Sequence, residues 1–194
     1  MTEPTPEKPL RADARRNRAR ILEVAQQVFA AEGLAAPIDA IATRAGVGVG
    51  TIYRHFPTKE ALFSAILAHR VDVITEEING LLDAADPGAA FFGLFRRLIE
   101  TGLGNKDLFD AMASTTNTEL TATSTERSGA MLTELGKLLA RAQEAGAVRA
   151  DVSVTDVKGL LVGAHAMHRH HEGDSRATAQ MITIIEDGLR PPAG

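Results

Sequence analysis

The stretch AGVGVGTIYRHFPTKEAL, residues 45–62, places three glycines at alternate positions and follows them with an aromatic residue, basic residues and Pro-Thr-Lys. A glycine loop that cradles a nucleotide phosphate follows a strand, and its spacing is G-x-G-x-x-G or it ends in Gly-Lys-Ser/Thr. Here the spacing is G-x-G-x-G, and the preceding IDAIATRA has the period of a helix. We therefore expect two short helices, residues 38–45 and 49–55, joined by a tight turn at Gly46. That arrangement is a helix-turn-helix, whose second helix lies in the major groove of DNA.

Helical periodicity continues on both sides of this stretch. A helix is expected before it over residues 13–32, and after it Pro57 ends the second short helix while Thr58 caps a fourth. The further helices expected are 87–103, 106–113, 131–145, 153–167 with Ser153 and Asp156 as its capping box, and 176–189. The Ser/Thr-rich segment 114–129 predicts a loop or a frayed helix start. We find no convincing strand, so the prediction is an all-α chain of about nine helices.

Composition narrows the class of protein. The chain has no cysteine, which excludes disulfides and thiolate metal sites and fits a cytoplasmic location. No window reaches 18 uncharged apolar residues, and the first ten residues lack the apolar core of a signal peptide, so no membrane segment is expected. Residues 11–59 hold eight Lys/Arg and four Asp/Glu, whereas the whole chain carries a net charge of −4. This cationic first quarter predicts contact with a polyanion at one end of the chain.

The stretch IDAIATRAGVGVGTIYRHFPTKEALF, preceded by RARILEVAQQVFAAEG, resembles the DNA-binding domain of the TetR family of bacterial transcriptional regulators. The resemblance covers roughly residues 15–65, and the rest of the chain resembles the family in length and helical content. It implies an all-helical homodimer whose C-terminal domain forms both the dimer interface and an effector pocket. We therefore expect a disordered tail over 1–10, a three-helix DNA-binding domain over 11–60, and an effector-binding and dimerisation domain over 61–194.

The resemblance also implies roles for individual residues. Thr51 and Arg54 are expected to reach base edges, whereas Tyr53, His55 and Lys59 match positions that contact phosphates. The expected DNA-binding set, with two arginines of an N-terminal arm, is Arg15, Arg16, Thr43, Arg44, Gly48, Val49, Gly50, Thr51, Tyr53, Arg54, His55 and Lys59.

The C-terminal two thirds carry the expected effector pocket and dimer interface. Apolar residues of the middle helices are either ordinary core or the lining of a pocket, and the sequence leaves both interpretations open. The expected effector-binding set is Phe91, Phe95, Arg96, Leu98, Phe109, Met112, Thr116, Met131 and Leu135. Gly159 and Gly163 stand four residues apart on one expected helix, and isolated glycines lower helix stability. A close helix–helix contact would account for them. The expected dimer interface is Gly159, Leu160, Gly163, Met167, Met181 and Ile185.

These expectations define a ligand-responsive homodimeric transcriptional repressor. It binds a near-palindromic operator in double-stranded DNA through the major groove, and a mostly apolar small molecule releases it. We expect no cofactor and no metal. One alternative is a metal-responsive regulator that uses the segment His165–His171, where three imidazole rings can share one helix face; the other interpretation of that segment is a polar helix end. A helical enzyme that uses the C-terminal pocket is a further alternative, although we find no Ser/His/Asp order, paired-carboxylate motif or nucleotide loop.

Overall fold

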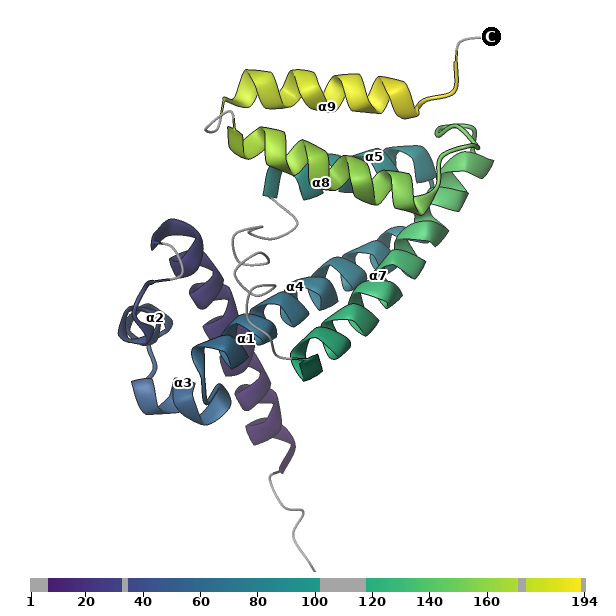
Figure 1. Ribbon diagram of the computed structural model, residues 1–194. Coiled ribbons are helices and arrows are strands. Elements are labelled where there is room, and N and C mark those ends of the chain that lie inside the picture. Colours follow the sequence, from purple (N-terminus) through teal and green to yellow (C-terminus); the bar gives the residue numbers. More distant parts are fainter. Residues whose placement is uncertain (1–6, 33–34, 102–117, 171–173, 193–194) are drawn as a thin grey trace, which may run out of the picture. The chain divides into compact units, whose positions relative to one another are not determined.

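The computed structural model describes residues 7–32, 35–101, 118–170 and 174–192, and within these ranges all regular structure is helical (Figure 1). The helices in the described ranges are α1 (Glu7–Glu32), α2 (Ile38–Ala45), α3 (Val49–His55), α4 (Lys59–Leu81), α5 (Pro87–Thr101), α7 (Thr118–Glu144), α8 (Val154–His170) and α9 (Ser175–Leu189). The all-α prediction is confirmed. None of these helices combines the length and the apolar character that crossing a membrane requires.

The first helix begins earlier than the sequence predicted. α1 starts at Glu7, so residues 7–10 are helical and not part of a disordered tail. Pro9 had suggested an irregular segment, but it lies in the first turn of α1. The backbone N–H groups of a first turn have no partner within the helix, so a proline costs little there. Residues 1–6 lie outside the described residues.

The described part of the Ser/Thr-rich segment, residues 118–129, is helical. α7 is helical from Thr118. Within this helix, Arg127 Nη1 donates to both carboxylate oxygens of Asp72 on α4, at 2.6 and 2.5 Å. Further along α7, Thr133 Oγ1 donates to the Gly129 carbonyl at 3.0 Å. Such bonds to the preceding turn allow hydroxyl side chains inside a helix. The helix predicted over 106–113 lies outside the described residues.

The chain divides into two compact units, and within the described residues the boundary between them falls in α4, between Arg70 and Val71, and again in α7, between Ser124 and Thr125. The core of the first unit is formed by apolar residues of α1, α2, α3 and the beginning of α4. The rings of Phe29 on α1 and Phe63 on α4 lie 4.4 Å apart at its centre. This unit therefore extends past residue 60, where the sequence had suggested a domain boundary, because the first turns of α4 complete its core.

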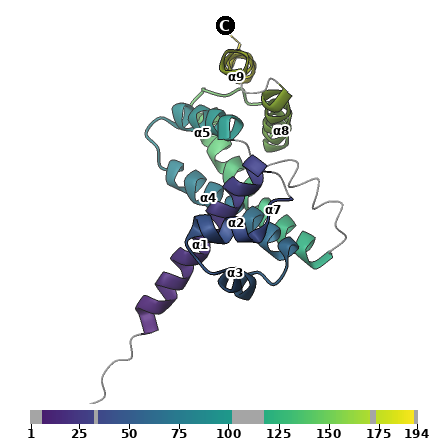
Figure 2. The same cartoon turned by 90° about the vertical axis from the view of Figure 1, so that its left-hand side faces the viewer.

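α5 is the central helix of the second unit. Its buried residues are Gly88, Phe91, Phe92, Leu94, Phe95, Leu98 and Ile99, and they share a core with α8 and α9 (Figure 2). Asp86 caps this helix, since its Oδ1 accepts from the Ala89 N–H at 2.9 Å. Gly88 allows a close approach to the loop after α7, because a Cβ there would lie 2.5 Å from Ala147 Cβ.

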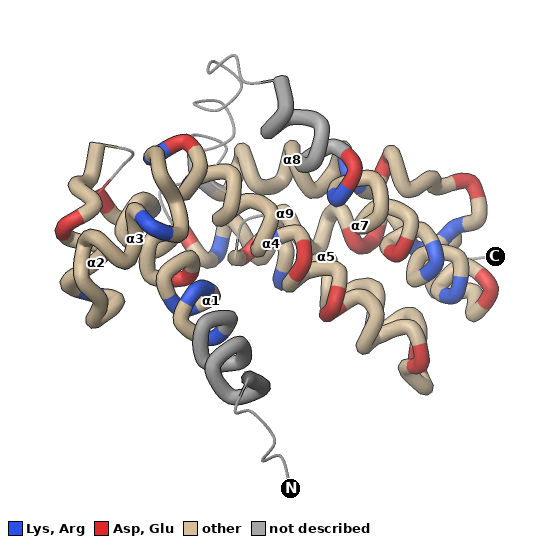
Figure 3. Tube along the Cα trace, turned by 90° about the horizontal axis from the view of Figure 1, so that it is seen from below, with Lys and Arg blue, Asp and Glu red and all other residues tan. Residues whose placement is uncertain are grey.

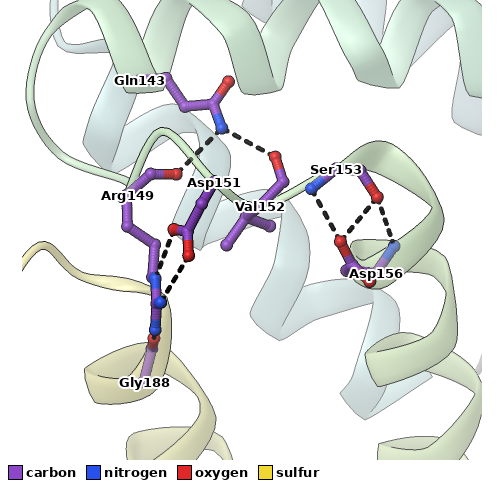
Figure 4. A network of polar contacts seen from close by, with 7 residues as sticks. All are labelled: Gln143, Arg149, Asp151, Val152, Ser153, Asp156 and Gly188. Carbon is purple, nitrogen blue, oxygen red and sulfur yellow. Dashed lines mark hydrogen bonds and ion pairs between the residues drawn. The ribbon is translucent and has the colours of Figure 1, made fainter.

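The predicted capping box at the start of α8 is confirmed. The Ser153 N–H donates to Asp156 Oδ2 at 2.9 Å, and the Asp156 N–H donates to Ser153 Oγ at 3.2 Å (Figure 4). The hydrogen bonds from the Ser153 side chain and backbone lower the pKa of Asp156. Two orphan N–H groups of the helix end are thereby satisfied reciprocally.

Candidate nucleic-acid interface

A left-handed glycine makes the turn between α2 and α3. Gly46 has φ 63° and ψ 37°, and the Val47 N–H donates to the Ala42 carbonyl at 3.0 Å. Most side chains disfavour this conformation, so glycine at position 46 has a backbone reason. The boundaries predicted for both short helices, 38–45 and 49–55, match α2 and α3. The two helices are packed against each other, as a helix-turn-helix requires.

α3 is anchored on one side and open on the other. Ile52 is fully buried and Phe56, directly after the helix, is 3% exposed, so these two residues fix α3 to the core of the first unit. Tyr53 is 49% exposed, and both Arg54 and His55 are exposed. The solvent-facing side of α3 therefore carries the polar side chains that the sequence assigned to DNA.

The start of α3 has no side-chain cap. Gly48 is the N-cap residue in extended conformation, and the Thr51 N–H donates to its carbonyl at 2.8 Å. Gly48 and Gly50 are exposed, whereas Val49 is partly buried against the core. A Cβ at Gly50 would meet no atom within 4 Å. The first turn of α3 therefore leaves its backbone accessible to another molecule.

Arg44 has a partner within the protein. Its Nη2 lies 2.6 Å from Glu32 Oε1 at the end of α1, and both side chains are largely solvent-exposed. Thr43 is exposed next to it, and its hydroxyl donates to the Asp39 carbonyl at 2.9 Å. Arg44 can contact a DNA phosphate only by exchanging or sharing its carboxylate partner. This pair could not be predicted from the sequence, because its members stand 12 residues apart on different helices.

Lys59 is tied into the core of the same unit. Its Nζ donates to the Ala36 carbonyl at 2.9 Å and lies 5.4 Å from the centre of the Phe29 ring. The lysine is partly buried at the first position of α4. It thus links α4 to the segment between α1 and α2, a structural role that the sequence did not suggest.

The arginines of α1 differ in their surroundings. The Arg18 guanidinium lies 5.2 Å from the centre of the Phe56 ring, at the end of α3, whereas Arg20 donates to Asn17 Oδ1 at 3.3 Å. Arg16 is exposed, and the side chain of Arg15 lies outside the described residues. Figure 3 marks the Lys and Arg positions along α1, α2 and α3. Arg18 is therefore a basic residue beside the helix-turn-helix that the expected DNA-binding set omitted.

Comparison with known protein families decides the identity of this unit and of the chain. A family model described as "Bacterial regulatory proteins, tetR family" matches residues 21–66. A second model, described as "Transcriptional regulator SbtR-like, C-terminal domain", matches residues 86–191. The chain belongs to the TetR family. It is accordingly a DNA-binding transcriptional regulator and not an enzyme.

Similar proteins of known structure agree with this assignment over nearly the whole chain. A TetR transcription regulatory protein from Mycobacterium vanbaalenii is 46% identical, with 94% of this chain and 100% of that chain covered and a TM-score of 0.76. A TetR transcriptional regulator from Streptomyces coelicolor is 33% identical, with 91% and 99% covered and a TM-score of 0.75. An HTH-type transcriptional regulator from Staphylococcus aureus is 35% identical over 75 residues, which are 38% of this chain and 40% of that regulator. The chain thus matches about two fifths of the length of this curated relative.

The effector residues expected in this TetR chain lie mainly in the core of the second unit. Phe91 and Phe95 are 1% and 2% exposed, and Leu98 and Leu135 are also buried. Met131 is partly buried and packs against this core. The expected residues Phe109, Met112 and Thr116 lie outside the described residues.

Arg96, the expected polar contact to an effector, has an acidic partner in the protein. Its Nη2 donates to both carboxylate oxygens of Glu186 on α9, at 2.8 Å each. The Glu186 side chain is only 8% exposed, so the guanidinium compensates a largely buried charge. The neighbouring Arg97 pairs with Glu77 on α4. Both arginines therefore tie α5 to other helices of the unit.

A shallow surface hollow lies at another corner of the second unit, among Gln143, Gly146, Val148, Arg149, Ala150, Asp151, Pro191 and Pro192. A hydrogen-bond network shapes this corner (Figure 4). Gln143 Nε2 donates to the carbonyls of Arg149 and Val152 at 3.0 and 2.8 Å, and Arg149 forms a two-point pair with Asp151 at 2.6 Å. That pair raises the pKa of Arg149 and lowers the pKa of Asp151. None of the residues expected to bind an effector lines this hollow.

The residues expected at a dimer interface divide into two groups. Gly159 and Gly163 are exposed and Met167 is 50% exposed, so all three are accessible on α8. Met181 is 8% exposed and belongs to the core of its own unit, while Leu160 and Ile185 pack partly against that core. An apolar stripe of helical period faces the protein's own core first, and Met181 lies on that stripe.

Two apolar residues at the surface of α8 and α9 were missed. Val162 is 53% exposed and Ile184 is 62% exposed. They interrupt the polar face of their helices, and that departure from periodicity is the sequence signal that would have identified them. α8 and α9 pack against each other in the same unit, and each of them carries one of these exposed apolar residues.

The histidine segment shows one defined contact. His168 Nδ1 lies 2.7 Å from Thr178 Oγ1 on α9. Among the residues that the structure describes, no group of three or more His, Asp or Glu side chains is arranged to hold a metal ion. His171 and the side chain of His170 lie outside those residues, so the predicted three-histidine face is only partly covered.

Proposed function

We propose that this TetR-family regulator is a homodimeric repressor that binds a near-palindromic operator and is released by a small, mostly apolar effector. The observation that carries the proposal is the position of α3, which is anchored by Ile52 and Phe56, exposes Tyr53, Arg54 and His55, and leaves Thr51 partly exposed. Such a regulator acts where a bacterial chromosome lies, which is the cytoplasm.

DNA contacts divide between bases and backbone. Thr51 and Arg54 read base edges, because they lie one turn apart on the exposed side of α3. Tyr53, His55 and the arginines near the start of α1 supply phosphate contacts that fix the position of α3 in the groove. Arg44 and Lys59 contribute to the backbone contact only after adjusting their bonds to Glu32 and Ala36.

The proposed dimer uses the exposed side of α8 and α9. Gly159 and Gly163 leave the surface of α8 flat, and Val162, Met167 and Ile184 supply apolar area beside them. A two-fold arrangement presents two copies of α3 to successive faces of the major groove, about 34–36 Å or a multiple apart. The symmetry of the dimer then requires a near-palindromic operator.

The proposed effector site lies among α4, α5 and α7 of the second unit. Support comes from the concentration of phenylalanines on α5 and from Met131, whose flexible side chain is partly buried at the edge of this core. An acidic effector would compete with Glu186 or Glu77 for the arginines of α5. Release of DNA requires that the effector bind the DNA-free form more tightly than the DNA-bound form.

The test is sequence discrimination by the recognition residues. A duplex selected from a random pool is compared with a scrambled duplex, using wild type, Thr51→Ala and Arg54→Ala. Each variant should lose about 1–3 kcal/mol of preference for the selected duplex, the typical value of a good base contact. Unchanged preference in both variants would show that α3 does not read the operator through these residues.

A further inference from the structure

Few side chains lie on the solvent-facing side of α3, opposite the buried Ile52. In a helix with 3.6 residues per turn, positions 50 and 54 lie opposite the buried Ile52, whereas positions 51 and 53 lie about 100° to either side of it. Gly50 contributes no side chain, and a Cβ there would meet no atom within 4 Å. The side chain directly opposite Ile52 is therefore Arg54, which is flanked by the partly buried Thr51 and by Tyr53.

Arg54 is the only Lys or Arg of α3, and the space around it is open. A long helical side chain leans back over the preceding turn, and for Arg54 the residue four positions earlier is Gly50. Within the described residues no carboxylate pairs with Arg54, in contrast to Arg44, which binds Glu32 at 2.6 Å. The guanidinium is thus free to enter a groove without breaking an ion pair.

Thr51 holds this guanidinium on the free side of the helix. Arg54 Nη2 donates to Thr51 Oγ1 over 3.4 Å, between residues three positions apart. A guanidinium has five N–H donors, so this long bond leaves most of them available. The bond restricts the rotamers of a flexible side chain before DNA arrives, and this reduces the entropy lost on binding.

We propose that Arg54 reads a guanine in each half-site of the operator and that Thr51 is its positioning residue. The fork of N–H groups on arginine matches the O6 and N7 acceptors of guanine in the major groove, whereas adenine offers a donor in place of O6. His55 and Thr51 lack two parallel donors, so the strongest base preference of each half-site falls on the base pair that Arg54 meets. This assignment rests on the proposed function, because it assumes that α3 enters the major groove.

The experiment replaces guanine N7 one position at a time. A duplex selected from a random pool by the wild-type protein is synthesised with 7-deazaguanine at each guanine, and the affinity of each duplex is measured by fluorescence anisotropy. One symmetry-related pair of guanines should be sensitive, with an affinity loss of roughly ten-fold when N7 is replaced by C–H. In Arg54→Ala this sensitivity should vanish, and all deazaguanine duplexes should bind as tightly as the unmodified one.

Four further variants distinguish the base contact of Arg54 from the positioning role of Thr51 and from the effect of charge. Thr51→Val keeps the shape of the side chain but removes the acceptor, so the guanine/deazaguanine ratio should fall several-fold, and Thr51→Ser should restore it. Arg54→Lys keeps the charge but not the fork, so it should retain the salt dependence and lose the ratio. Arg20→Gln removes a charge from α1 and should leave the ratio unchanged. Circular dichroism melting confirms that each variant is folded.

The outcomes are distinguishable. If no sequence is enriched from the pool, both the proposed function and this inference fail. If a sequence is enriched but no guanine is sensitive, or if Arg54→Ala keeps the sensitivity, the inference is overturned while the proposed function stands. If Thr51→Val keeps the full ratio, the positioning role of Thr51 is wrong.

Discussion

Gly163 tests the proposed dimer face, because substitutions there should change folding and association in opposite directions. It lies within α8, is exposed, and would place a Cβ with no atom within 4 Å. Gly163→Ala should therefore stabilise a single protomer by about 1 kcal/mol, the difference in helix propensity. In a dimer the same residue approaches the partner. Gly163→Leu should cost about 1–3 kcal/mol for each overpacked contact, and two-fold symmetry places the substitution in the interface twice.

The assay combines sedimentation equilibrium with urea unfolding over a range of protein concentrations. A loss of about 2–6 kcal/mol in association corresponds to a dimer dissociation constant raised from about 30-fold to more than 10⁴-fold. Gly93→Leu is the matched control, since Gly93 is an exposed helical glycine of α5 with equally open surroundings. It should leave the dissociation constant unchanged. A Gly163→Leu protein that dimerises as tightly as wild type would refute the placement of Gly163 at the interface.

Three other predictions concern local contacts. Gly88→Ala should lower the free energy of unfolding by about 1–3 kcal/mol in urea titrations, because its Cβ would lie 2.5 Å from Ala147 Cβ. Lys59→Met should lower thermal stability by about 1–2 kcal/mol through loss of the bond to the Ala36 carbonyl, and weaken selected and scrambled DNA alike. An unchanged melting temperature would contradict the structural role of Lys59. Because Ser153 lowers the pKa of Asp156, the stabilisation by this carboxylate is present above its ordinary pKa and is lost as pH falls through the lowered value. Carboxyl-carbon NMR should show the pKa of Asp156 rising in Ser153→Ala.

The helix boundaries and caps that neighbouring residues determine could be predicted from the sequence. Gly46 adopts positive φ and ends α2, and Pro57 follows α3, so both short helices could be bounded from the sequence. The capping box of Ser153 and Asp156 likewise joins residues three positions apart. In each case the residues that determine the structure are neighbours in the chain.

Partners that are distant in sequence could not be predicted. Lys59 binds a carbonyl 23 residues away, and Arg96 binds Glu186 across 90 residues. Both basic residues had been assigned to external ligands, because an unpaired cation in a sequence carries no sign of an internal partner. Met181, which was expected at a dimer interface, is buried in the core of its own unit for a related reason. Its helical stripe suits a protein core and a dimer interface equally well, and only the packing of α9 decides between them.

The most direct test of the account is the sequence selected from a random DNA pool by the full chain. We predict an enriched site with two inverted half-sites whose centres are about 10–10.5 base pairs or a multiple apart, bound by two protomers. Mobility shifts with wild type and Arg54→Ala would establish the stoichiometry and the dependence on α3. A pool without enrichment, or a single half-site bound by one protomer, would contradict the proposal that this regulator is a dimer that reads its operator through α3.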